Sequence, residues 1–187
     1  MANFPAWAIE KAVVVPYQEH WAERASAEQA RLVELLSPWL AEGVEHVGST
    51  AVPGLAAKPI VDLMASVRDH TDRAVHAPLI EDGWHLVPPE LDERPWRRLF
   101  VRPDAAGLHR IAHLHLVSPG HRRWQAQIAF RDALRADAGL AREYAELKRR
   151  LSADHGADRE AYTAGKSAFV VRVLRTCPGG YMPDELN

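Results

Sequence analysis

Residues 44–67 read VEHVGSTAVPGLAAKPIVDLMASV, and this stretch decides the fold that the sequence predicts. The run Val44–Val47 predicts a strand, and the glycines and prolines of residues 48–59 predict a rigid loop after it. In Ile60–Val67 successive side chains point to opposite faces, so Asp62 lies on the face away from the valines. The stretch therefore predicts a strand, a loop and a second strand that carries a carboxylate.

Helices and further strands are predicted on both sides of this stretch. Helices are expected over Tyr17–Leu36, Thr71–Asp82, Trp124–Arg135, Leu140–Leu151 and Asp158–Thr176, and strands over Trp84–Val87, Trp96–Val101 and His109–Val117. Strands fill the first two thirds of the chain and helices the last third, which is typical of the α+β class. We expect a single domain over residues 1–187, built as a mixed β-sheet backed by helices. Its core is expected over about 12–175, with tails at 1–11 and 178–187.

The composition is that of an ordinary globular chain. The 187 residues are 47% apolar and 26% charged. The formal net charge is −2, whereas broad binding to nucleic acid or to a membrane surface needs a basic excess. The single cysteine, Cys177, excludes an internal disulfide and a cysteine-based zinc cluster. No apolar run approaches ~18 residues and the N-terminus lacks a signal-peptide pattern, so a cytoplasmic protein is expected.

The loop from Gly48 to Pro59 has the composition of an anion site. Small residues let backbone N–H groups approach an anion closely, and Lys58 adds a positive charge. The spacing of Gly48, Gly54 and Lys58 does not fit the phosphate loop of nucleotide triphosphatases, and Pro59 stands where that motif has a hydroxyl. The alternative interpretation is a rigid structural turn.

Three further polar residues lie in strands that otherwise predict a core. Asp62 must be paired, hydrogen-bonded or metal-bound, because an isolated buried carboxylate is costly. His113 and His115 share one face, about 7 Å apart along the strand. They suit either two ligands of one metal or a pair for proton transfer and phosphate binding. The alternatives are a capped structural Asp62 and histidines that only pack.

Basic residues recur beside aromatic residues. Arg98 stands in a predicted strand near Phe100, and Arg131 follows Phe130 in a predicted helix. Two i, i+4 pairs lie on later helices, Tyr144 with Lys148 and Tyr162 with Lys166. Each pair alone is typical of a solvated helix face, but pairs that converge on one site would form a phosphate clamp.

These motifs together resemble the GrpB family over about residues 12–175. They are EHVGSTAVPGLAAKPIVD at 45–62, RLF at 98–100, HLHLV at 113–117, FRDALR at 130–135, EY with Lys148 at 143–148, and Tyr162 with Lys166. The family resembles the nucleotidyltransferase superfamily in fold, and the same type of domain occurs fused after dephospho-CoA kinase. The resemblance implies a strand, a Gly-Ser turn at Gly48-Ser49, and a strand that carries metal carboxylates at Asp62.

The sequence departs from the carboxylate pattern of that superfamily. Active members carry Asp-x-Asp on the second strand and a third acid on a later strand, but here Met64 replaces the second acid. On the later strand His113 and His115 stand where an acid would be sought. One Asp with His is a poor site for a hard cation, because imidazole favours softer metals.

The sequence thus predicts a nucleotidyl- or phosphoryl-transferase for a nucleotide or another phosphorylated ligand, with a divalent metal, Mg²⁺ or Mn²⁺. Asp62, His113 and His115 are the expected catalytic residues, and Asp62 and His115 the expected metal ligands. Phosphate or nucleotide binding is expected from Gly48, Ser49, Thr50, Lys58, Arg98, Arg131, Lys148, Tyr162 and Lys166. One alternative is a nucleotide- or phosphate-binding module without turnover that assists a partner enzyme. The other is a scaffold or folding-assistance domain.

Overall fold

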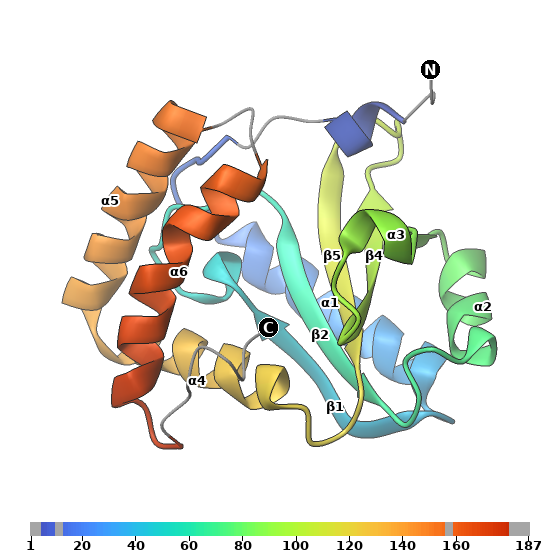
Figure 1. Ribbon diagram of the computed structural model, residues 1–187. Helices are drawn as coiled ribbons and strands as arrows, with labels where there is room; N and C mark the ends of the chain where they lie inside the picture. The colour runs from blue at the N-terminus through green and yellow to red at the C-terminus, as the bar shows by residue number, and fades with distance from the viewer. Residues whose placement is uncertain (1–4, 10–12, 156–158, 180–187) are drawn as a thin grey trace.

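The computed structural model describes residues 5–9, 13–155 and 159–179 (Figure 1). Its helices and strands follow one another along the chain in the order given next. They are η1 (Ala6–Ile9), α1 (His20–Leu36), β1 (Leu40–Val47), η2 (Ser49–Ala51), β2 (Val61–Val67), α2 (Arg73–Glu81), β3 (His85–Leu86), α3 (Pro89–Asp92), β4 (Arg97–Pro103), β5 (Arg110–Val117), α4 (Arg122–Ala136), α5 (Ala138–His155) and α6 (Arg159–Thr176).

The strands form one mixed sheet in the order β1-β2-β5-β4-β3. β2 and β5 are parallel neighbours at its centre, and the other pairs are antiparallel. Asp62 lies opposite His113 in the register of β2 and β5, and Met64 lies opposite His115. Directly opposed residues share a face, so these four side chains lie on one side of the sheet.

The opposite face of the sheet carries the main apolar core. Leu63 of β2, Leu114 of β5 and Phe100 of β4 pack there against α1 and α2, and Trp21 of α1 is fully buried among them. Burial of such large apolar side chains is the main source of stability in a domain of this size. This layer therefore fixes the sheet and leaves the Asp62 face for other contacts.

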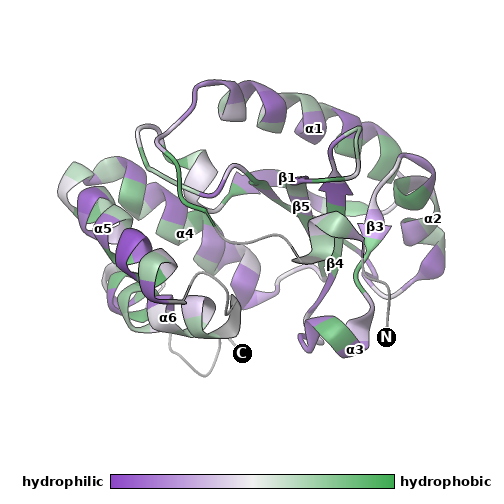
Figure 2. Cartoon of the chain, turned by 90° about the horizontal axis from the view of Figure 1, so that it is seen from above, coloured by the Kyte–Doolittle hydropathy of each residue, from purple (hydrophilic) through white to green (hydrophobic). Residues whose placement is uncertain are grey.

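Helices α4, α5 and α6 gather at one side of the sheet and form a second core (Figure 1). Phe130, Tyr144 and Phe169 stack there with ring centroids 4.9–6.3 Å apart. Val52 and Leu55 of the loop insert into this core, so the loop is clamped to the helices. In Figure 2, α1 and α6 lie on opposite sides of the sheet.

The α+β class, the mixed sheet and the helical last third are confirmed. Most predicted elements agree within a few residues, and α2 tolerates Pro78 in its interior. The short helix α3 was not predicted, and η1 lies inside the expected tail 1–11. The tail expected at 178–187 falls outside the described residues beyond Gly179. Within the described ranges no helix is long and apolar enough to cross a membrane.

Candidate functional site

The site begins where β1 ends and the chain turns at Gly48. Gly48 has φ +71°, and a Cβ there would lie 2.6 Å from Asp62 Oδ2. Only glycine permits this approach, because it adopts positive φ without strain and has no side chain to collide. The Gly-Ser turn therefore packs closely against the β2 carboxylate.

Asp62 is paired with His113 on the neighbouring strand. His113 Nδ1 lies 3.0 Å from Asp62 Oδ1, and the Asp62 side chain keeps 33% of its surface exposed. Burial opposes ionisation of Asp62, but the hydrogen bond with His113, the neighbouring imidazoles and the charge of Lys166 lower its pKa to about 2. Asp62 is thus an ionised, solvent-accessible carboxylate at neutral pH.

Two lysines distant in sequence meet on one aromatic ring beside Asp62. Lys58 Nζ from the loop lies 4.0 Å from the centroid of the Tyr162 ring, and Lys166 Nζ from α6 lies 4.7 Å from it. Such contacts hold an ammonium group over a ring face. Burial lowers the pKa of Lys166, while the charge of Asp62 opposes this effect. The loop and α6 therefore bring positive charge to the β2 carboxylate.

Helix α5 holds the loop through a buried lysine and a tyrosine. Lys148 is 2% exposed, and its Nζ donates to Ala56 O at 2.5 Å and lies 4.8 Å from the centroid of the Tyr144 ring. Burial, then the charges of Lys166 and Arg149, lower the pKa of Lys148 to about 7. Burial raises the pKa of Tyr144, and the nearby Ser49 hydroxyl opposes this effect. We call the set assembled here the central polar cluster: Ser49, Lys58, Asp62, Tyr144, Lys148, Tyr162 and Lys166.

His115 lies on the same face and is held by a cation. Arg97 Nη1 lies 2.5 Å from His115 Nδ1, and Asp92 binds the rest of the Arg97 guanidinium at 2.9 and 2.5 Å. Burial and the charge of Arg97 lower the pKa of His115 well below its usual range. A guanidinium can only donate, so Nδ1 of this neutral ring must accept and the proton must lie on Nε2.

Three residues expected in the phosphate clamp do not join the central polar cluster. Arg98 opposes Leu116 of the main core and so lies on the other sheet face from Asp62. Arg131 makes ion pairs with Glu45 and Asp132, which occupy its guanidinium. Thr50 is 2% exposed, and its hydroxyl lies 3.0 Å from His46 Nε2. The Thr50 contact fixes the loop to β1, and the Arg131 ion pair with Glu45 fixes α4 to β1.

The sequence reasoning missed Arg97, Asp92 and the part played by Tyr144. Arg97 stands beside Arg98 in RRLF, and strand alternation puts one of the two on each face. Only the register of β4 with β5, in which Arg97 opposes Val117, decides which one faces His115. Asp92 lies in the unpredicted helix α3 and carried no signal of its own.

The donor set does not fit a two-metal centre. Such a centre needs carboxylates that hold two ions close together, but Met64 is a buried core residue and His115 faces Arg97. Asp62 Oδ1 is already engaged by His113. Among the described residues, no group of three or more His, Cys, Asp or Glu side chains is arranged around a common point for a metal ion.

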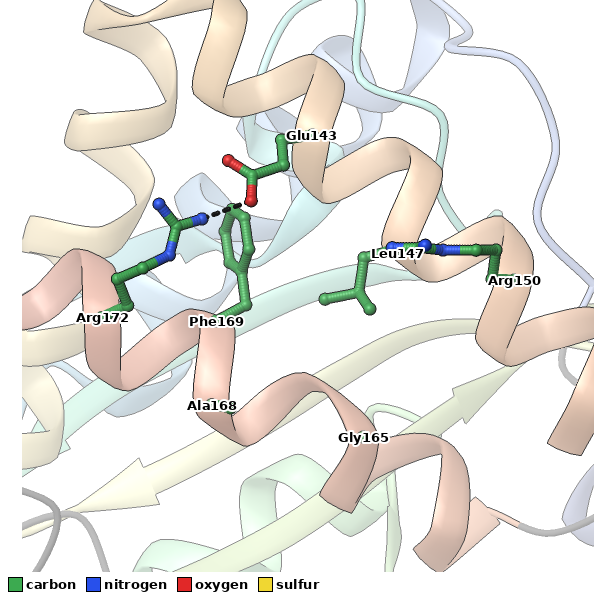
Figure 3. A pocket seen from close by; sticks show the side chains of 7 residues that line it. All are labelled: Glu143, Leu147, Arg150, Gly165, Ala168, Phe169 and Arg172. Carbon is green, nitrogen blue, oxygen red and sulfur yellow. Dashed lines mark hydrogen bonds and ion pairs between the residues drawn. The ribbon is translucent and has the colours of Figure 1, made fainter.

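A separate pocket of about 310 Å³ lies between α5 and α6, away from this chemistry (Figure 3). Its lining combines apolar side chains with an ion pair in which Arg172 Nη2 lies 2.5 Å from Glu143 Oε1. Gly165 lies at its edge, where an added Cβ would fall 2.4 Å from a methyl group of Leu151. The two helices are therefore closely packed at Gly165, beside the pocket. The pocket includes none of the predicted site residues.

The chain matches the family model described as "GrpB protein" over residues 11–176. A UPF0157 protein of Pseudomonas aeruginosa is 38% identical over 164 residues, which cover 86% of this chain and 65% of that protein. The UPF0157 protein YqkA of Bacillus subtilis is 31% identical over 175 residues, covering 91% of this chain and 48% of YqkA. This chain thus spans about half the length of the B. subtilis relative.

Solved structures show the same fold. The GrpB protein of Enterococcus faecalis superposes with a TM-score of 0.74 at 28% identity, covering 86% of this chain and 94% of the other. The GLD-2/RNP-8 complex gives 0.55 at 14% identity, with coverage of 91% and 56%. The Cid1 poly(U) polymerase gives 0.53 at 13% identity, with coverage of 86% and 50%. At such low identity the last two likenesses establish the fold alone.

Proposed function

Because this chain belongs to the GrpB family, whose fold is nucleotidyltransferase-like, we propose that the central polar cluster binds the phosphate groups of a nucleotide or similar ligand. The Cid1 structure has Mg and 3'-dATP bound, so a nucleotide is the ligand class that the shared fold suggests. Ser49 and the Gly48 turn would face the phosphates, with Lys58 and Lys166 as their counter-charges.

The observation that carries this proposal is the convergence of Lys58 and Lys166 on Tyr162 beside Asp62. Lys148 and Lys166 both act electrostatically on Asp62, and Lys58 shares the Tyr162 ring with Lys166, in a chain whose net charge is −2. Ammonium groups concentrated in this way favour a polyanion, because charge-assisted hydrogen bonds to phosphate are strong. Among the described residues, Lys166 makes no hydrogen bond or ion pair, so it is available to a ligand.

Group transfer is the second candidate, favoured by one observation. Asp62 is ionised, one-third exposed and packed against the Gly48 turn. A strand, a Gly-Ser turn and a second strand with a carboxylate follow one another in the same order in nucleotidyltransferases. A divalent metal, Mg²⁺ or Mn²⁺, would need further oxygen ligands that Met64 and His115 do not supply. The donor set therefore supports binding more strongly than metal-dependent turnover.

The test is thermal stability with ATP and with inorganic pyrophosphate, each measured with and without Mn²⁺. Ligand at 100 times its Kd raises the free energy of unfolding by about 2.7 kcal/mol. We expect both compounds to stabilise the protein and Lys166→Gln to weaken their affinity at least tenfold. Arg150→Gln is the matched control, because it removes an exposed charge from α5.

The metal arm separates the two candidates. If Asp62 acts as a counter-charge to the lysines, Mn²⁺ adds no stabilisation in the wild type or in Asp62→Asn. Stabilisation that requires Mn²⁺ and disappears in Asp62→Asn would favour group transfer. No effect of either compound on the wild type would contradict phosphate binding at the cluster.

A further inference from the structure

Three arginines converge at the far end of the sheet face, outside the central polar cluster. Arg97 of β4 and Arg123 of α4 place their guanidinium carbons 5.1 and 5.0 Å from the centroid of the Trp96 ring. Arg94 Nη1 donates to Asp92 O at 3.1 Å. The Asp92 carboxylate lies 3.7 Å from Arg94 Nη1 and binds Arg97 through both oxygens.

Arg123 is the unexplained member of this group. Its Nε is buried without a hydrogen-bond partner, and no carboxylate pairs with its guanidinium among the described residues. Burial, followed by the charges of Arg97 and Arg94, lowers the pKa of Arg123 to about 10. A partly buried cation that is repelled by two others and has no anion beside it raises the free energy of the folded state.

We propose that Arg94, Arg97 and Arg123 form a second anion site that takes a phosphate group. Guanidinium groups bind phosphate oxygens in pairs of parallel hydrogen bonds, and a phosphate group here would give Arg123 the anion that it lacks among the described residues. Trp96 is stacked on His121 and covered by guanidinium groups, so the site recognises charge rather than a nucleobase.

The arginine site lies beside the central polar cluster, and the charge of Arg94 contributes to the lowered pKa of Lys166. Arg97 opposes Val117, while Asp62 opposes His113, four residues earlier on β5. At the rise of a strand this separation is about 13 Å along the sheet. Free phosphate, or the second phosphate group of a ligand already bound at the cluster, would bring the same chemistry to this site.

The test follows the indole N–H resonance of Trp96 by ¹⁵N NMR during titration with inorganic phosphate at constant ionic strength. Trp96→Phe assigns the signal. We expect a saturable shift in the wild type, and at least tenfold weaker binding in Arg123→Gln. The control Arg122→Gln removes an exposed charge from the adjacent position of α4 and should bind phosphate as the wild type does.

The Lys166→Gln variant keeps this result distinct from the proposed function. If the arginine site binds free phosphate, the Trp96 shift persists in Lys166→Gln. If it takes the second phosphate of a larger ligand, adenosine 3',5'-bisphosphate moves the signal far more strongly than phosphate does, and Lys166→Gln removes that advantage. A Trp96 signal unmoved by both compounds, or equal affinity in Arg123→Gln and wild type, would overturn the proposal while leaving the cluster proposal untouched.

Discussion

Replacing the buried Lys148 by methionine should flatten the pH dependence of stability above neutral pH. Lys148 is 2% exposed and its pKa falls from 10.5 to about 7 on folding, chiefly because of burial. Between these two values the unfolded chain binds the proton more tightly than the folded chain does. The free energy of unfolding therefore rises as pH increases from about 7 toward 10.5.

The expected size of the effect follows from the two pKa values of Lys148. From pH 7 to pH 9 this one group contributes a rise of about 2 kcal/mol in the free energy of unfolding. Lys148→Met has nearly the same shape and carries no charge, so this contribution disappears. The lost hydrogen bond to Ala56 O lowers stability by roughly 1–3 kcal/mol, but equally at every pH.

The assay is urea unfolding at pH 7, 8 and 9 for the wild type, Lys148→Met and the control Arg150→Met, which removes an exposed charge from α5. This window lies below the titration of Tyr144 and Tyr162, whose pKa values are raised by burial. The control should rise with pH as the wild type does. Equal slopes in wild type and Lys148→Met would show that Lys148 keeps its proton in the folded protein, and would refute the reasoning.

Three further predictions concern the same sheet face. Gly48→Ala should lower the free energy of unfolding by about 2 kcal/mol or more in urea titrations, because of positive φ and the contact with Asp62 Oδ2; an unchanged value would contradict it. Met64→Asp should destabilise the protein by roughly 3–5 kcal/mol, since it buries an unpaired carboxylate, whereas Met64→Leu should cost under about 1.5 kcal/mol. Nitrogen NMR at pH 7 should show His115 protonated on Nε2 only, and Arg97→Met should release a mixture of both forms; a proton on Nδ1 in the wild type would refute this.

Much of the fold and part of the site could be predicted from local sequence patterns. Strand alternation alone puts Asp62 and Met64 opposite the valines of β2, and the structure confirms it. The loop composition and the family motif pointed to Gly48 and Lys58, which the structure brings to Asp62 and Tyr162. These inferences held because they depend on neighbours within one strand or one loop.

The remaining features depend on contacts between segments far apart in the chain. Alternation cannot say which of Arg97 and Arg98 faces His115, because that choice follows from the register of β4 against β5. Similarly, Tyr162 and Lys166 look like a solvated helix pair until α6 packs beside the loop that carries Lys58. The positive charge of Arg131 alone does not show whether it binds a ligand or, as the structure has it, forms an ion pair with Glu45.

Met64 and His115 stand where nucleotidyltransferases carry carboxylates, and the two replacements have a common consequence: both remove ligands for a divalent metal ion. Met64 fills the second acid position with an apolar group that joins Val47, Val117 and Trp124 in a small core, so a hydrated ion has no room there. His115 is tied to Arg97, which adds positive charge where a metal would also bring it. In the function that we propose, the charge that divalent ions supply to phosphates in nucleotidyltransferases would come from fixed side chains, lysines at one end of the face and arginines at the other. Asp62, paired with His113 and close to Lys166, would balance those cations when no phosphate is bound.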